Sequence, residues 1–221
     1  MQDLIKQEKF EIEVLDRLKT SRLLERLVFT GGTMLRLCFG LDRFSVDLDF
    51  WILKRINEKE LFYNLKSYLE KFYELKDAKL KFYTLLFELK SSNYPRNLKI
   101  EIRRKPKDIK AKLAIAYSKY SNKQVMVKVV SLEDMMKFKI EAFLDRREIR
   151  DVFDIEFLLK RGIELDVNKD KLKRLLKGIN SLTRRDYSVK LGSLLEKEQR
   201  VYYTQENFKI LRLKINSKLS E

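Results

Sequence analysis

Residues 27–52 constrain the fold of this chain more than any other stretch. They read LVFTGGTMLRLCFGLDRFSVDLDFWI, in which a short apolar run meets a glycine pair, residues 33–39 have helical spacing, and residues 46–52 alternate in polarity. A strand has a side-chain period of two, so the last segment places Asp47 and Asp49 on one face and its apolar residues on the other. The stretch predicts a short strand, a helix and a second strand with an acidic face.

The aspartate pair needs a compensating cation or an unusual protonation state. Two carboxylates a few ångströms apart repel each other, and a divalent cation bound between them removes the repulsion. The alternative is an edge strand with a polar outer face, although aspartate is disfavoured in strands. For the pair alone, the two interpretations have about equal weight.

The glycine pair strengthens the first interpretation. Gly31 and Gly32 lie between a strand and a helix, where exposed backbone amides can hold phosphate groups, and Thr33 adds a hydroxyl donor. A glycine pair alone is typical of an ordinary turn. Followed by a short helix and an acidic strand, it predicts a phosphate cradle beside a metal site.

A third carboxylate lies on a later predicted strand, residues 97–104. There Lys99, Glu101 and Arg103 share one face. Two-metal phosphoryl transfer uses carboxylates to hold the ions that activate the attacking hydroxyl, and Glu101 could supply one. An outer face of alternating charge explains the pattern equally well.

Composition excludes several kinds of chemistry and suggests a partner. The 221 residues include no histidine and only one cysteine, Cys38, so histidine-based catalysis, the usual zinc sites and an internal disulfide are excluded. A metal would be held by carboxylates, which favours Mg²⁺ or Mn²⁺.

The net charge of +16 indicates a polyanionic partner such as RNA, although an AT-rich genome or adaptation to heat also produces lysine-rich chains. With no secretory signal and no apolar run of membrane-spanning length, we expect a cytoplasmic protein without a membrane partner.

The pattern changes near residue 130. Residues 1–130 mix strands and helices, whereas residues 131–221 have helical spacing only, so we expect an α/β core followed by a helical domain. Helices are expected over 1–26, 33–39, 57–76, 131–145, 149–161, 168–179 and 205–219, and strands over 27–29, 46–52, 79–90, 97–104 and 125–130.

The helical half carries charges on apolar faces. Lys139 and Arg146 lie on the apolar stripe of the helix over 131–145, and Asp151 lies on that of the next helix, where Glu156 faces outward. Long cationic side chains can extend from such a stripe into solvent. Our hypothesis is instead that Asp151 or Asp154 orders Lys139 or Arg146 in an active-site cleft.

Two segments resemble one protein family. GGTMLRLCFGLDRFSVDLDF resembles the first motif of the AbiEii/AbiGii-type nucleotidyltransferases, which are toxins of phage-abortive and other toxin–antitoxin systems, and KIEAFLDRREIRDVFDIEFLL resembles their later motif. The similarity covers roughly residues 28–160. It implies an α+β, polymerase-beta-like nucleotidyltransferase fold with a small mixed sheet, followed by a helical half that closes the active-site cleft.

The resemblance also implies roles for particular residues. The metals would be held by Asp47 and Asp49, and less securely by Glu101. Lys139 would contact the triphosphate, and these four residues would be the catalytic ones. The nucleotide-binding residues would be Gly31, Gly32, Thr33, Arg43, Ser45, Lys139, Arg146, Asp151 and Asp154.

The implied activity is magnesium-dependent transfer of a nucleoside monophosphate from an NTP to a hydroxyl acceptor. The basic charge makes RNA, first of all the acceptor end of tRNA, the favoured acceptor, and a protein the next. A cognate antitoxin is the implied partner. Two alternatives are a catalytically silent RNA-binding module, against which the intact aspartate pair argues, and a transferase for cationic small molecules, which a basic protein would repel.

Overall fold

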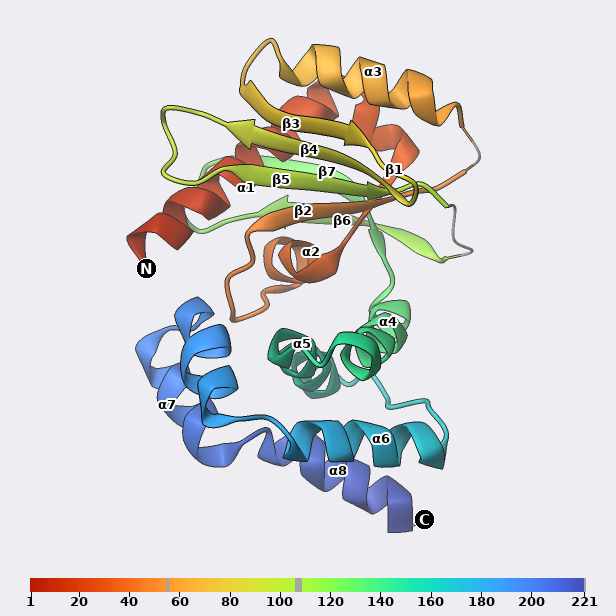
Figure 1. The fold of residues 1–221 in the computed structure, drawn as a ribbon, viewed down its shortest axis with the longest axis vertical. Coiled ribbons are helices and arrows are strands. Elements are labelled where there is room, and N and C mark those ends of the chain that lie inside the picture. The colour runs from red at the N-terminus through yellow and green to blue at the C-terminus, as the bar shows by residue number, and fades with distance from the viewer. Residues whose placement is uncertain (55, 106–108, 221) are drawn as a thin grey trace. The chain divides into compact units, whose positions relative to one another are not determined.

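A computed structural model describes residues 1–54, 56–105 and 109–220 (Figure 1). The chain divides into two compact units, Met1–Ser131 and Leu132–Glu221. The first unit is a mixed sheet with helices, and the second is helical. The sequence therefore predicted the α+β class and the small mixed sheet correctly.

The first unit contains a seven-stranded sheet with the order β3-β4-β5-β2-β1-β7-β6. Strands β2 and β5 are parallel, as are β1 and β7, and the remaining neighbours are antiparallel. Its elements are α1 (Gln2–Thr20), η1 (Leu23–Arg26), β1 (Leu27–Thr30), α2 (Gly31–Phe39), β2 (Asp47–Ile52), α3 (Glu58–Leu69), β3 (Glu74–Leu80), β4 (Thr84–Lys90), β5 (Leu98–Arg103), β6 (Ala111–Tyr117) and β7 (Gln124–Val130).

The acidic strand β2 lies at the centre of this sheet, between β5 and β1. Its apolar residues Leu48 and Phe50 are buried, and the Phe50 ring stacks on that of Phe29 in β1 with 5.1 Å between centroids. Burying such side chains contributes about 1.5–3 kcal/mol each. The apolar face therefore anchors β2 while the same alternation leaves the aspartates on the opposite face.

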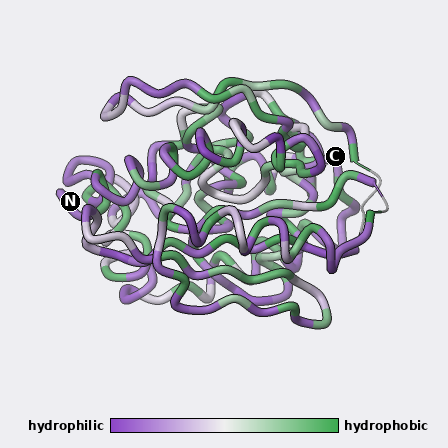
Figure 2. Tube along the Cα trace, turned by 90° about the horizontal axis from the view of Figure 1, so that it is seen from above, coloured by the Kyte–Doolittle hydropathy of each residue, from purple (hydrophilic) through white to green (hydrophobic). Residues whose placement is uncertain are grey.

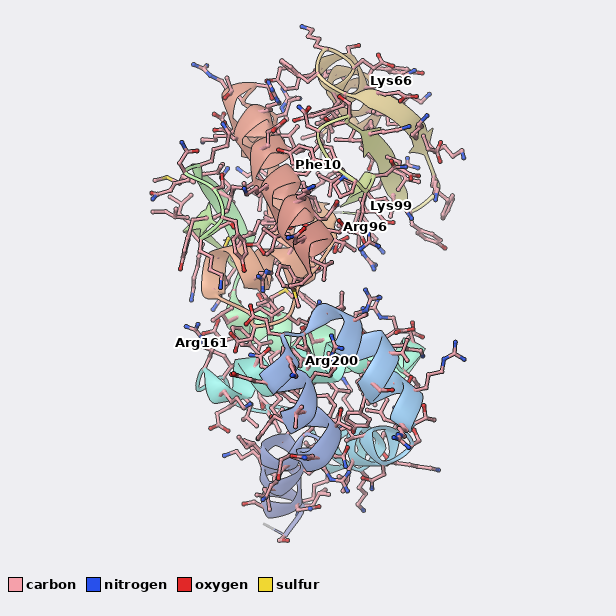
Figure 3. The ribbon with its side chains drawn as sticks, turned by 90° about the vertical axis from the view of Figure 1, so that its left-hand side faces the viewer. Phe10, Lys66, Arg96, Lys99, Arg161 and Arg200 are labelled. Atoms are coloured by element: carbon pink, nitrogen blue, oxygen red, sulfur yellow. The ribbon has the colours of Figure 1, made fainter. Side chains whose placement is uncertain are left out.

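Helices α1 and α3 each pack on other parts of the first unit through aromatic contacts. Phe10 of α1 stacks on Tyr94 with 4.5 Å between ring centroids and meets Tyr73 edge-on, and Figure 3 shows it on the side of α1 that faces the strands. Phe62 of α3 stacks on Phe87 of β4. Figure 1 shows α3 running along the β3 side of the sheet.

Three sequence expectations for this unit were wrong. The single strand expected over 79–90 is a hairpin, made of the end of β3, a turn and β4. The helix expected over 57–76 ends at Leu69, and the last part of that range belongs to β3, which begins at Glu74. Strand β6 was missed. It is the edge strand next to β7, at the end of the sheet opposite β3. Its Leu113, Ile115 and Tyr117 are exposed, so the apolar residues in its sequence do not mark a buried face.

The second unit is helical, as expected from the sequence. Its elements are α4 (Leu132–Arg146), α5 (Ile149–Lys160), α6 (Lys169–Asn180), the π-helix η2 (Asp186–Leu191), the 3₁₀ helix η3 (Gly192–Leu194), α7 (Lys197–Glu206) and α8 (Lys209–Ser220). The helix expected over 205–219 is interrupted at Asn207 and Phe208, which both have positive φ. Such residues leave the helical conformation and separate α7 from α8.

Glu156 contradicts the outward orientation expected from helical spacing. Its side chain is fully buried in α5 and pairs with Lys160 at 3.0 Å, and the Lys160 ammonium in turn donates to the Tyr203 hydroxyl of α7. Helices late in the chain therefore cover what the local pattern marks as a solvent face. Burial raises the pKa of the Glu156 carboxyl, and Lys160 opposes that rise.

Within the described ranges, no helix combines the length and the apolar character needed to cross a membrane. Figure 2 shows short hydrophobic and hydrophilic segments interchanging along the chain.

A buried polar group joins α1 to α2. Glu8 pairs with Arg36 of α2 and accepts a 2.6 Å hydrogen bond from the Ser118 hydroxyl, and the Arg36 guanidinium lies 3.8 Å from the centre of the Phe44 ring. One turn later, Glu11 is fully buried and neither carboxyl oxygen has a hydrogen-bond partner within the described chain. Burial raises the pKa of the Glu11 carboxyl well above its usual range, Glu8 and Asp47 add to the rise, and Arg36 opposes it.

The raised pKa of Glu11 predicts a pH-dependent stability. Because the folded-state pKa exceeds the unfolded value of about 4.3, the stabilising contribution is complete below that pH and is lost as the pH rises through the folded-state pKa. Glu11→Gln keeps a neutral group of the same shape and should unfold at a higher temperature than the wild type at pH 8, with little difference at pH 4. Thermal unfolding across that range tests this. Glu25→Gln, at an exposed carboxyl of η1, should follow the wild type, and a parallel pH profile for Glu11→Gln would contradict the prediction.

Candidate active site

The carboxylates predicted from the sequence share one face of the sheet. Asp49 lies opposite Glu101 of β5 and opposite Thr30 of β1, and Asp47 lies opposite Lys99. Directly paired residues project to the same side of a sheet, and residues two apart on a strand do so too. Asp47, Asp49 and Glu101 therefore belong to a single surface, which we call the carboxylate face.

Gly31 brings the N-terminus of α2 against Asp49. Its φ is +81°, a left-handed value that side chains rarely adopt, and a Cβ atom on it would lie 2.4 Å from Oδ2 of Asp49. Only glycine allows this approach. The Asp49 carboxylate consequently lies at the positive end of the α2 dipole, which favours a negative charge there.

Gly32 makes a second close approach, to the loop between α2 and β2. A Cβ atom on it would lie 2.5 Å from Nη2 of Arg43 and 2.9 Å from Oγ of Ser45. Arg43 is buried, and its Nη1 donates to the carbonyl oxygen of Phe44 at 3.0 Å. Both loop residues implied by the family resemblance therefore pack on the glycine pair, and they bring a buried positive charge close to it.

Thr33 has a structural contact that the sequence did not predict. Its side chain is fully buried, and its hydroxyl donates a 2.6 Å hydrogen bond to the carbonyl oxygen of Asp47. That donor ties the first turn of α2 to the start of β2. The geometry favours Thr33 as a residue that positions the glycines and the aspartates.

The donor set suits Mg²⁺ that arrives with a nucleotide. Across the described residues, no three carboxylate or thiol side chains form a ready-made metal cluster. Asp47 and Asp49 nevertheless supply hard oxygen donors from one strand face. Mg²⁺ in proteins is commonly held by one or two carboxylates together with substrate phosphates and water, so these two residues fit it. Glu101 is exposed beside Asp49 and does not complete a triad in this structure.

In the second unit, four charged residues form a buried ion-pair cluster. The Lys139 ammonium lies 3.2 Å from Oδ1 of Asp151 and 2.6 Å from Oδ2 of Asp154. Arg146 forms a bidentate pair with Asp151 through two hydrogen bonds of 2.7 Å. Both aspartates are fully buried, whereas the Arg146 side chain is half exposed.

The turn between α4 and α5 creates this cluster. Arg147 has a φ of +56°, and its amide donates to the Phe143 carbonyl oxygen. This left-handed residue ends α4 at Arg146, and α5 begins three residues later, at Ile149. The reversal brings the lysine of one helix to the aspartates of the next. Asp151 or Asp154 was expected to order Lys139 or Arg146, and the structure contains these pairs. The four formal charges sum to zero, so the cluster is compensated within its own helix pair.

One element of the site could not be found by motif analysis. Arg36 of α2 forms a buried ion pair with Glu8, which ties α1 to the helix that begins at the glycine pair. The only sequence signal was a charged residue within the apolar helix over 33–39. Nothing in the local spacing indicated that Glu8, 28 residues earlier, would meet it.

A family model described as "Nucleotidyl transferase AbiEii toxin, Type IV TA system" matches residues 13–216. That range contains the glycine pair, the three carboxylates and the ion-pair cluster. No curated protein matches the chain significantly.

Two crystal structures from Helicobacter pylori are similar over nearly the whole chain. JHP933 has a TM-score of 0.57 and 24% identity, covering 95% of this chain and 94% of its own. A second chain, described as a candidate nucleotidyltransferase, has a TM-score of 0.58 and 25% identity, covering 94% of this chain and 96% of its own.

The contact between Gly31 and Asp49 can be tested against a matched glycine. Gly162 has nearly the same φ, +82°, but a Cβ atom there would meet nothing within 4 Å. Gly162→Ala should therefore cost only the left-handed backbone penalty, about 1–2 kcal/mol. Gly31→Ala should cost more, because its methyl group also displaces the Asp49 carboxylate. Denaturant unfolding of both variants measures the difference, and equal losses would show that the contact with Asp49 has no energetic weight.

Asp151→Asn probes the ion-pair cluster. It removes the charge that Arg146 and Lys139 share, and hydrogen bonds to charged groups contribute about 1.5–3 kcal/mol to stability. We expect the free energy of unfolding to fall by about that amount. Asp145→Asn, at an exposed carboxyl of α4, should change it by less than about 0.5 kcal/mol. A stable Asp151→Asn variant would mean that the cluster contributes little to folding.

Proposed function

The chain belongs to the AbiEii family of nucleotidyl transferase toxins of type IV toxin–antitoxin systems, and from that premise we propose that it transfers a nucleoside monophosphate from an NTP to a hydroxyl group of RNA. The acceptor end of tRNA is the first candidate. The observation that carries the proposal is the contact of Gly31 with the Asp49 carboxylate. It joins a helix start of the kind that can bind phosphate to a carboxylate that could hold a metal ion. We propose a cytoplasmic site of action, where NTPs and RNA are available, and a cognate antitoxin as partner.

The nucleotide's phosphates would lie at the start of α2. The amides of Gly31 and Gly32 point out of the helix, and the absence of side chains lets a phosphate approach the backbone closely. Arg43 and Ser45 pack against Gly32 and keep this turn in place. Since Asp49 already lies at the same helix end, the phosphates can approach it only with a cation between them.

Mg²⁺ bound by Asp47 and Asp49 would supply that charge neutralisation and polarise the transferring phosphoryl group. Glu101 lies beside Asp49, on the side of β2 away from the glycine turn. Its carboxylate would accept the proton of the acceptor hydroxyl, whose oxygen bonds to the α-phosphorus. The bond between the α-phosphorus and the oxygen bridging to the β-phosphate breaks, and pyrophosphate leaves.

For the helical unit we propose a nucleotide-binding role. Asp151 and Asp154 hold the Lys139 ammonium, which has three donors, and Asp151 orients the half-exposed Arg146. A lysine fixed in this way loses little additional conformational freedom when it meets a phosphate. Lys139 would be the contact to the triphosphate, with Arg146, Asp151 and Asp154 positioning it.

RNA is the favoured acceptor because of charge. A net charge of +16 attracts a polyanion and speeds its association. The same field repels the cationic substrates of small-molecule transferases. A protein acceptor stays the second candidate.

The decisive experiment incubates the protein with each labelled NTP, magnesium and total RNA. Label should enter RNA with the wild type and fall at least about 100-fold with Asp47→Ala, because one of the two metal-binding carboxylates is lost. Asp42→Ala, at an exposed aspartate of the loop that precedes β2, should retain activity. EDTA should abolish labelling, and added Mg²⁺ should restore it.

The distribution of the label separates the alternatives. Label in protein or in small molecules would replace RNA as the acceptor. Absence of label from all three fractions, with RNA binding intact, would indicate a catalytically silent RNA-binding module.

A further inference from the structure

The turn between β3 and β4 exposes two adjacent aromatic side chains. Phe82 is 80% exposed and Tyr83 75%, the two largest values among the big apolar side chains of the described residues. Their ring centroids are 4.6 Å apart, and the rings are nearly perpendicular. Tight hairpin turns usually carry small or polar residues, and paired exposed aromatics often mark a binding surface.

This aromatic turn is held rigidly. The Lys81 amide donates to the Thr84 carbonyl oxygen at 2.8 Å, which closes the turn. Arg104, the residue after β5, holds the turn: its Nη1 donates to the carbonyl oxygens of Lys81 and Phe82, and its amide donates to that of Tyr83. Its Nε is paired with Glu58. A ligand that stacks on these rings would meet a turn whose backbone is already ordered, which lowers the entropic cost of binding.

Sheet register connects the aromatic turn to the carboxylate face. Glu101 lies opposite Leu86 of β4, and Arg103 lies opposite Thr84. Phe82 is four residues from Leu86, which at about 3.4 Å per residue places the turn on the order of 14 Å along the strand from the level of Glu101. Since the glycine turn lies on the β1 side of Asp49 and Glu101 on the β5 side, an acceptor would enter from the β4–β5 side.

Exposed cations accompany this path. Lys99 and Arg103 flank Glu101 on the same face of β5, and both are exposed. Arg96 lies close to Lys99 at the start of the strand (Figure 3), and Lys81 and Lys105 are exposed at the other end, beside the aromatic turn. Cations that can follow a phosphate backbone, together with aromatic rings on which bases can stack, are the combination that binds single-stranded nucleic acid.

We propose that the Phe82–Tyr83 turn and the outward cations of β5 form the binding surface for a single-stranded RNA acceptor. Bases stack on the two rings, Lys99 and Arg103 contact the phosphates, and the terminal hydroxyl reaches Glu101. The assignment of this RNA as acceptor rests on the proposed function, whereas RNA binding by the surface does not.

Direct binding tests the surface. The probe is a fluorescent single-stranded oligoribonucleotide of about ten nucleotides, titrated in the absence of NTP. Phe82→Ala/Tyr83→Ala should raise its Kd roughly tenfold or more, because each stacked base loses its aromatic partner. In a plot of log Kd against log salt concentration, Lys99→Ala/Arg103→Ala should also reduce the slope. The expected reduction is about 1.4, for the loss of two phosphate contacts on a single strand.

Ile115→Ala/Tyr117→Ala is the matched control. It removes two exposed apolar side chains from β6, at the opposite edge of the sheet, and should leave the Kd unchanged. Thermal unfolding shows whether each variant is folded, and Phe82→Leu/Tyr83→Leu provides a second variant that keeps apolar bulk but cannot stack bases.

Four outcomes decide the proposal. A raised Kd for both turn variants, with a raised KM for RNA and an unchanged kcat in the transfer assay, supports it. A raised Kd without any transfer to RNA by the wild type supports the surface and rejects the proposed function. Wild-type RNA affinity in both turn variants overturns the surface, even if transfer to RNA occurs. Loss of self-association or of antitoxin binding, with RNA affinity retained, overturns it in favour of a protein interface.

Discussion

The contact between Gly31 and Asp49 sets how closely the first turn of α2 approaches the acidic strand β2. A residue with a φ of +81° and no side chain lets the start of α2 touch the carboxylate of the neighbouring strand. The Thr33 hydroxyl fixes the same turn to the backbone of Asp47. The α2 N-terminus lies against Asp49 and favours a negative charge there, and the buried Arg43 packs on Gly32 in the same turn.

Each unit contains a buried ion-pair cluster whose charges are compensated locally. In the first, Glu8 meets Arg36 and Ser118, so the ionic contact that joins α1 to α2 is also hydrogen-bonded. In the second, the α4–α5 turn brings Lys139 and Arg146 to two fully buried aspartates. Buried ion pairs add net stability only when geometry and hydrogen bonding are good. We therefore interpret these clusters mainly as contacts that fix the positions of their side chains.

The arrangement of the sheet separates two tasks along its central strands. On the β1 side, the glycine turn offers amides and the helix dipole, which suit phosphate. On the β5 side, Glu101 lies between exposed cations, and the hairpin beyond carries exposed aromatic rings. A transferase must keep its nucleotide and its acceptor on opposite sides of the reacting phosphorus, because the attacking and leaving oxygens lie in line. The strand order β4-β5-β2-β1 allows that separation.

Spacing within a few residues and short motifs were enough to identify the glycine pair, the alternation that puts Asp47 and Asp49 on one face, the α+β class and the family. Only the tertiary structure placed Glu101 beside Asp49, since strand register is a contact between segments about 50 residues apart. It also reassigned residues 79–90 to a hairpin with an aromatic turn, and it buried Glu156 under helices from the end of the chain. Local periodicity reports which side chains share a face, whereas what covers that face, and which charge meets which, is decided by distant segments.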